Sequence, residues 1–171
     1  MSLAIVYSRA QLGINAPLIT VETHLSNGMP GLSIVGLPET AVKESKDRVR
    51  SALLNAGFDF PPKRITINLA PADLPKEGGR YDLAIALGIL AASGQVPAEA
   101  LEKLECIGEL ALSGELRPVN GSLTAAMACA RDNRSLLLPY ANGEEAAKYS
   151  GCNVYAEKNL LDVFAHLKKK K

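Results

Sequence analysis

The stretch ITINLAPADLPKEGGRYDLAIALGILAASG, residues 65–94, joins a strand pattern to a helix pattern through a single loop. Residues 65–69 alternate β-branched or apolar side chains with polar ones, which predicts a strand. Residues 81–93 are apolar nearly all round, which predicts a helix buried on every side, with Asp82 favouring the free N–H groups at its start. The loop from Pro75 to Asp82 gathers charges and paired glycines, so it is either a candidate site or a tight turn whose charges face water.

Upstream of this stretch, the sequence predicts three strands and one helix. Strands are expected at residues 3–7, 18–25 and 32–36, with turn signals between them, which indicates an antiparallel meander. Pro38 and Glu39 then mark a helix start, because proline is tolerated at the first helical position and a carboxylate suits the positive end of the helix dipole. This helix is expected to run to about Asn55 and to stop at Gly57.

Downstream, strand and helix patterns alternate. A hairpin is expected from residues 106–112 and 116–119 around the turn Ser113-Gly114-Glu115. Helices are expected at 121–131, 143–149 and 159–167, and strands at 135–139 and 153–156. This alternation implies a parallel or mixed sheet with helices packed against it, so the expected fold class is α/β, of the α+β mixed-sheet kind. We expect one domain over residues 1–167, with residues 168–171 as a basic tail or the start of a linker.

Composition narrows the class of protein. The 171 residues are 47% hydrophobic with a formal net charge of +1, so the chain can bury a core but has no global attraction for nucleic acid or membranes. Cys106, Cys129 and Cys152 are widely spaced and form no CxxC pair, which favours reduced thiols. With only His24 and His166 available, we expect no metal site. The absence of a basic leader and of an apolar run of ~18 residues predicts a cytoplasmic protein without a membrane partner.

Catalytic motifs are scarce. Neither G-x-x-x-x-G-K-[ST] nor G-x-G-x-x-G occurs, so no nucleotide site is predicted on this chain. Lys76, Glu77 and Asp82 could support acid–base chemistry, but no serine, threonine or cysteine lies between Pro71 and Ala92 to act as a nucleophile.

Basic residues offer a second kind of candidate site. The possible DNA contacts are Lys43, Lys46, Arg50, Lys63 and Arg64, together with the terminal lysines. The basic stripe on the helix is diluted by Glu44 and Asp47, so a solvated helix face is the favoured interpretation.

Two long motifs carry a resemblance to a known family. INLAPADLPKEGGRYDL, residues 67–83, and VGLPETAVKE, residues 35–44, resemble the amino-terminal domain of magnesium-chelatase-like AAA+ proteins of the ComM/YifB family. The resemblance covers essentially the whole chain. It implies a domain like the proteolytic domain of Lon proteases, with the ribosomal protein S5 domain 2-like fold.

The resemblance also implies that the catalytic residues of Lon are missing. The Lon serine position falls on Arg80 and its lysine partner on Leu123, so we expect no catalytic residue and no peptidase activity. The degenerate Lon-type loop then consists of Lys76, Glu77, Gly78, Gly79 and Arg80. We expect the two glycines to hold the turn and the three charged residues to form a polar contact surface.

The family resemblance implies a function for the chain as part of a larger machine. It would be a non-catalytic accessory domain of a hexameric AAA+ ATPase, similar to a DNA branch-migration helicase of natural transformation and recombination, and would serve assembly or substrate contact. Implied partners are its own AAA+ domain, sister subunits and single-stranded or branched DNA. No cofactor is expected in this chain, and ATP and Mg²⁺ would bind the ATPase domain. A Lon-type Ser-Lys peptidase and a direct DNA-binding module are the alternatives.

Overall fold

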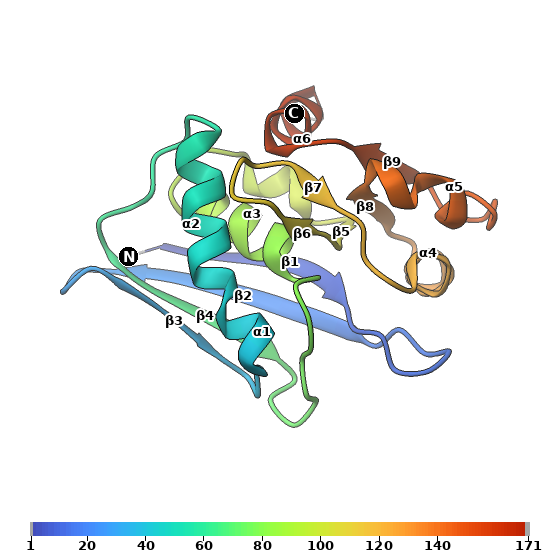
Figure 1. The fold of residues 1–171 in the computed structure, drawn as a ribbon, viewed down its shortest axis with the longest axis horizontal. Helices are drawn as coiled ribbons and strands as arrows, with labels where there is room; N and C mark the ends of the chain where they lie inside the picture. The colour runs from blue at the N-terminus through green and yellow to red at the C-terminus, as the bar shows by residue number, and fades with distance from the viewer. Residues whose placement is uncertain (1, 170–171) are drawn as a thin grey trace.

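The computed structural model describes residues 2–169, which form a central sheet of seven strands in the order β3-β4-β2-β1-β5-β8-β9 (Figure 1). These strands are β1 (Ser2–Arg9), β2 (Leu18–Ser26), β3 (Gly31–Val35), β4 (Arg64–Ala70), β5 (Leu104–Cys106), β8 (Ser135–Pro139) and β9 (Val154–Glu157). A separate hairpin of β6 (Glu109–Leu110) and β7 (Leu116–Arg117) surrounds the predicted turn. The helices are α1 (Thr40–Lys43), α2 (Ser45–Asn55), α3 (Asp82–Ala92), α4 (Ser122–Arg131), α5 (Gly143–Ala146) and α6 (Leu160–Lys169), with 3₁₀ turns η1 (Ala98–Leu101) and η2 (Tyr140–Asn142).

The strand pairing confirms a mixed α/β fold whose sheet is mostly parallel. Strand pairs β3/β4, β1/β5, β5/β8 and β8/β9 are parallel, whereas β1/β2 and β2/β4 are antiparallel. The expected three-stranded meander is wrong, because β4 lies between β2 and β3. The helical crossover from β3 to β4 returns the chain in the same direction, and this is the connection that a parallel pair requires.

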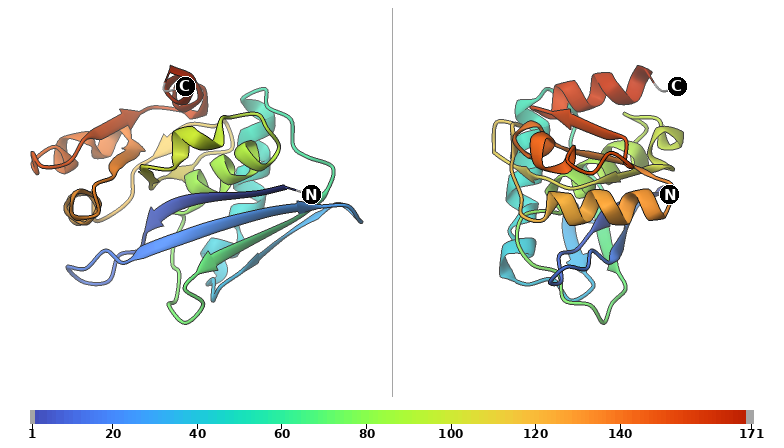
Figure 2. Two further views of the ribbon diagram at one scale, coloured as in Figure 1. Left: turned by 180° about the vertical axis from the view of Figure 1, so that it is seen from behind. Right: turned by 90° about the vertical axis from the view of Figure 1, so that its right-hand side faces the viewer.

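Helix α3 is the centre of the core, as its apolar sequence predicts. Every residue from Asp82 to Leu90 is buried, and the helix packs on β1 and β2. Figure 2 shows α2 and α3 on one face of strands β1 to β4, while none of the helices within residues 2–169 covers the opposite face. The alternation along these strands follows this arrangement, since Val6, Val21 and Ile67 point to the helices and are fully buried.

The first predicted helix is shorter than expected and is interrupted. Pro38 is extended and bridges to Lys76, so the first helix begins at Thr40. A break at Glu44 separates α1 from α2. The predicted apolar side is correct, because Val42, Val49 and Leu53 are fully buried.

Helix α6 continues to Lys169, so the first two residues of the predicted basic tail are helical, while Lys170 and Lys171 lie outside the described residues. Cys106, Cys129 and Cys152 are free thiols, and burial raises the pKa of each of them. None of the helices within residues 2–169 has the length and apolar character needed to cross a membrane.

Candidate functional site

The loop between β4 and α3 pairs with the segment that follows β3. Lys76 donates its backbone N–H to the Leu37 carbonyl at 3.1 Å, and its own carbonyl accepts from Glu39 N–H at 3.0 Å. Gly36 is needed beside this pair, because its φ is +107° and a Cβ there would come within 2.2 Å of the Leu69 carbonyl oxygen. The two motifs that carry the family resemblance therefore lie side by side.

Lys76 does not belong to a contact surface, so that expectation is wrong. Its side chain is fully buried, and its ammonium donates to the carbonyls of Gly36 and Pro71. Burial lowers the pKa of Lys76. The backbone pairing described above turns the side chain inward, where the two carbonyls satisfy it.

The middle of the loop forms a tight turn. Glu77 is exposed, and Gly78 has a φ of +76° and donates its N–H to Glu39 Oε1 at 2.7 Å. Gly79 lies against Glu109, since a Cβ on Gly79 would come within 2.4 Å of Glu109 Oε1. The positive φ of Gly78 favours glycine, whereas a side chain at Gly79 would displace the side chain of Glu109.

Arg80 is also buried rather than displayed on the surface. Only 7% of the residue is exposed; its Nε donates to the Arg9 carbonyl and its Nη1 to the Asn120 carbonyl, both at 2.8 Å. Its Nη2 is buried and has no hydrogen-bond partner among residues 2–169. Burial lowers the pKa of Arg80.

The loop lines a cavity of about 550 Å³. Five parts of the sequence form its walls, namely the β1–β2 connection, Glu39 before α1, the loop itself, Glu109 of β6 and the segment that leads to α4. The lining residues are Ala10, Gln11, Leu12, Glu39, Leu74, Pro75, Glu77, Gly78, Gly79, Arg80, Tyr81, Glu109, Pro118, Val119 and Asn120. The lining contains no serine, threonine or cysteine, and Leu123 is a partly buried residue of α4 outside the lining.

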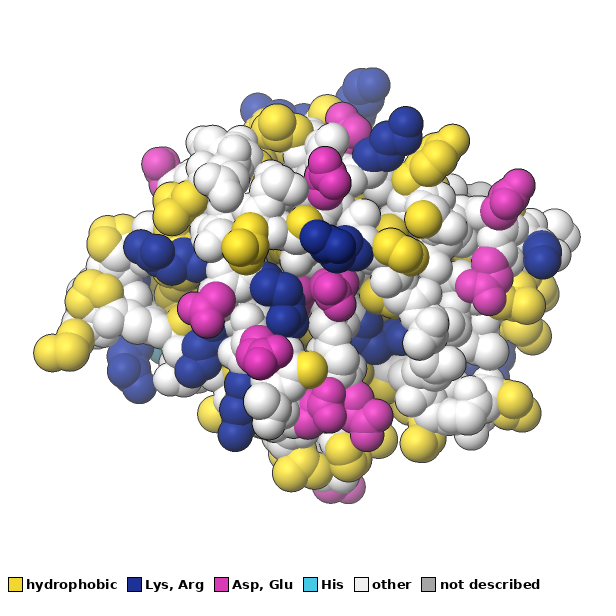
Figure 3. Space-filling view, viewed as in Figure 1, with side chains coloured by type: hydrophobic (Ala, Val, Ile, Leu, Met, Phe, Trp, Pro, Cys, Tyr) yellow, Lys and Arg dark blue, Asp and Glu magenta, His cyan; other side chains and the backbone are white. Residues whose placement is uncertain are grey.

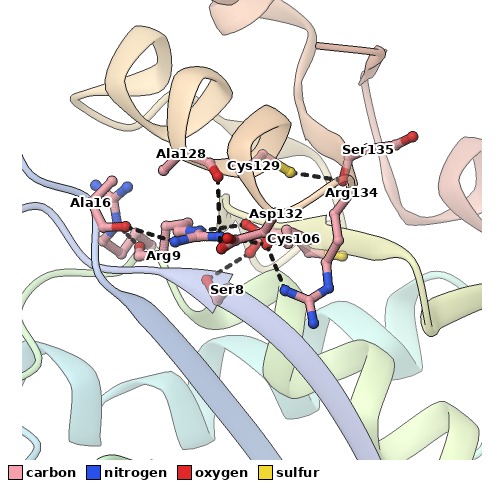
Figure 4. Close-up of polar contacts among 11 residues, drawn as sticks. Ser8, Arg9, Ala16, Cys106, Ala128, Cys129, Asp132, Arg134 and Ser135 are labelled. Carbon is pink, nitrogen blue, oxygen red and sulfur yellow. Dashed lines mark hydrogen bonds and ion pairs between the residues drawn. The ribbon is translucent and has the colours of Figure 1, made fainter.

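A buried ionic network, which the sequence patterns did not indicate, anchors the wall that holds Arg80 (Figure 4). Arg9 donates to both carboxylate oxygens of Glu105, from Nε at 2.6 Å and from Nη2 at 2.8 Å. Its Nη2 also pairs with Asp132, and Arg134 donates to Glu105 at 3.2 Å. Glu105 is fully buried and Arg9 is 3% exposed. The network ties β1 to β5 and to the end of α4, and the same Arg9 supplies the carbonyl that binds Arg80.

Asp82 lies in the first turn of α3, as expected, and also forms a second network. Its carboxylate accepts from Ser45 Oγ, from Arg48 Nε at 2.7 Å and from the Leu110 N–H at 3.0 Å. Asp82 therefore joins α2, α3 and β6, and Arg48 is a partner that the sequence patterns did not single out.

The basic candidates for DNA contact are exposed but are not all on one face. Lys43, Lys46 and Arg50 belong to α1 and α2, on the helical side of the sheet. Arg64 belongs to β4 and alternates with the buried Ile65, so it faces the other side of the sheet from these helices. Lys63 is exposed and donates to Asn27 Oδ1 at 3.3 Å. Figure 3 shows basic and acidic side chains interspersed on the face drawn there, without a continuous basic patch.

Comparisons with known proteins agree with the motifs. The model of the family ChlI, subunit ChlI of Mg-chelatase, matches residues 21–142. The chain is 58% identical over 167 residues to the competence protein ComM of Haemophilus influenzae, covering 98% of this chain and 33% of ComM. It is 55% and 53% identical over 170 residues to the uncharacterized proteins YifB of Salmonella typhimurium and Escherichia coli, covering 99% of this chain and 34% of each relative. The chain thus spans about a third of the length of these relatives. Because the family model matches more than half of the chain, the chain belongs to the family of the Mg-chelatase subunit ChlI.

Proposed function

We propose that this chain acts as a non-catalytic accessory domain of a longer, ring-forming AAA+ ATPase, and that it serves assembly or substrate contact. The observation that carries the proposal is the set of residues that line the cavity beside Arg80. The family resemblance assigns the Lon nucleophile position to Arg80, which lines this cavity, and the lining contains no serine, threonine or cysteine. An arginine stays protonated at any working pH and cannot attack a carbonyl carbon.

The relatives support the larger context of this proposal. ComM of Haemophilus influenzae is named a competence protein, and the region similar to this chain is a third of its length. We propose that the remainder of such a protein contains the ATPase, which would bind ATP and Mg²⁺, form hexamers and act on single-stranded or branched DNA. This domain would then contact the ATPase ring, a sister subunit or the DNA substrate.

The decisive experiment compares full-length Haemophilus influenzae ComM with a version lacking the region that matches this chain. Oligomer formation, ATP hydrolysis, DNA binding and branch migration are measured separately. We expect the deletion protein to keep its ATP-binding residues. We expect it to lose either oligomer formation or the DNA functions, which are DNA binding and branch migration. A deletion protein that behaves like the full-length protein in all four measurements would contradict the accessory role.

Peptidase activity is tested on the chain itself with casein and a fluorogenic peptide. We expect no turnover above that of a heat-inactivated sample. Turnover that survives Arg80→Ala but is lost in a folded Lys76→Ala variant would instead support a Lon-type peptidase. Titration with forked DNA at low salt tests direct DNA binding, because phosphate contacts weaken steeply as salt is added.

A further inference from the structure

Arg80 is a buried cation that the described part of the chain leaves without a countercharge. Both of its hydrogen-bond acceptors are neutral backbone carbonyls, and Nη2 has no partner. No carboxylate of residues 2–169 forms an ion pair with it. Buried charges are normally paired, because an isolated ion loses its hydration without compensation.

Other buried or partly buried arginines of the fold are paired. Arg9 contacts the carboxylates of Glu105 and Asp132, and Arg48 contacts that of Asp82. The same folded chain therefore places carboxylates beside two arginines and none beside Arg80. Since Arg80 differs from them in lining a cavity of about 550 Å³, a ligand that enters this cavity can supply the missing negative charge.

The other walls restrict what that ligand can be. Glu39, Glu77 and Glu109 line the same cavity, so a polyanion such as a nucleic-acid backbone would meet three carboxylates. A ligand with a single carboxylate meets less of this repulsion than a polyanion, and basic groups beside that carboxylate can pair with the glutamates. Leu12 and Val119 add apolar lining, and the volume lies in the range of pockets that enclose small ligands or short peptide segments.

We propose that this cavity binds a carboxylate carried by a peptide, and that the Arg80 guanidinium is the group that pairs with it. Gly78 and Gly79 keep side chains away from the wall beside Arg80, which leaves room for the peptide. The site is built from the residues of this chain alone, so it stands whether or not the chain serves as an accessory domain.

The test is an NMR titration of the ¹⁵N-labelled chain with short peptides of known charge. Ac-Ala-Glu-Ala-NH₂ presents a side-chain carboxylate and Ac-Ala-Ala-Ala-OH a carboxyl terminus, while Ac-Ala-Gln-Ala-NH₂ is the neutral control. We expect saturable shifts at the amides of Gly79 and Asn120 and at Arg80 Nε, with the neutral peptide binding at least about tenfold more weakly than one of the two acids. The better of the two acids identifies the source of the carboxylate.

Three variants and two competing ligands make the outcome decisive. Arg80→Gln is expected to weaken carboxylate binding at least about tenfold, whereas Arg50→Gln, on the exposed face of α2, leaves it unchanged. Glu109→Gln is expected to tighten carboxylate binding, because it removes a like charge from the lining, and this variant tests the site even if Arg80→Gln fails to fold. Equal binding of the acidic and neutral peptides, no tightening in Glu109→Gln, or tighter binding of inorganic phosphate or of a DNA oligonucleotide would overturn the proposal.

Discussion

Replacing Arg9 with methionine should strongly destabilise the fold, although Arg9 lies outside the motifs identified in the sequence. Glu105 is fully buried and accepts two hydrogen bonds from Arg9, at 2.6 and 2.8 Å. Without Arg9, only Arg134, at 3.2 Å, remains to pair with this carboxylate. Removing one partner of a buried ion pair costs about 3–5 kcal/mol, because the other charge stays desolvated and under-compensated. We expect a loss of about this size in the free energy of unfolding of Arg9→Met.

The assay is urea unfolding followed by circular dichroism, with the native chain and three further variants as controls. Asp132→Asn should change the free energy of unfolding by only about 0–1 kcal/mol, because 46% of the Asp132 side chain is exposed. Glu105→Met should cost less than Arg9→Met, since Arg9 keeps Asp132 as a partner. The double variant Arg9→Met/Glu105→Met should recover part of the loss. If Arg9→Met is no more destabilising than Asp132→Asn, the reasoning about the buried pair is refuted.

Three further outcomes are expected. Gly88→Ala should destabilise the chain by about 1–3 kcal/mol despite the better helix propensity of alanine, because the new Cβ would come within 2.3 Å of Thr23 Oγ1. The double variant with Thr23→Ala should recover stability in the same urea assay. If it recovers none, the steric explanation is wrong. Lys76 should be acetylated by acetic anhydride much more slowly than the exposed Lys43 in the folded chain, as mass spectrometry of the labelled peptides would show; equal rates would mean that Lys76 is accessible. Burial raises the pKa of Tyr81 to about 12 from an ordinary value of 10.0. The stability that its neutral phenol contributes is therefore complete below pH 10 and is lost as the pH rises from 10 to 12. Tyr81→Phe should flatten the pH dependence of the free energy of unfolding in this range, and an unchanged slope would argue against the shift.

Local sequence pattern was sufficient to predict most of the helices and strands, and it also predicted the glycine turn of the candidate site. The alternation of residues 65–69 and the apolar run of residues 81–93 correspond to β4 and α3, and the apolar side of the first helix was identified correctly. The paired glycines marked the turn before α3, because their conformational demand is local. The family was also recognisable from motifs that are contiguous in the sequence, and the family model confirms it.

The strand order and the start of the first helix could not be predicted from local sequence pattern. The position of β4 between β2 and β3 depends on which edges remain free once the crossover has formed, and this is a property of the whole sheet. Pro38 has the local character of a first helical residue, but its pairing with Lys76 keeps it extended. In both places a long-range pairing overrides a local preference.

The sequence by itself determined the residue types at the loop, including the absence of a serine, threonine or cysteine nucleophile and the presence of Lys76 and Arg80. Only the tertiary structure decided that these two cations are buried and that each has a different environment. Lys76 is satisfied by two carbonyls, whereas Arg80 lines a cavity with one nitrogen unpartnered. The physical reason is that burial and charge pairing depend on atoms contributed by segments far apart in the chain. The carbonyl groups of Arg9 and Asn120, which hold Arg80, lie 71 and 40 residues away from it in the sequence.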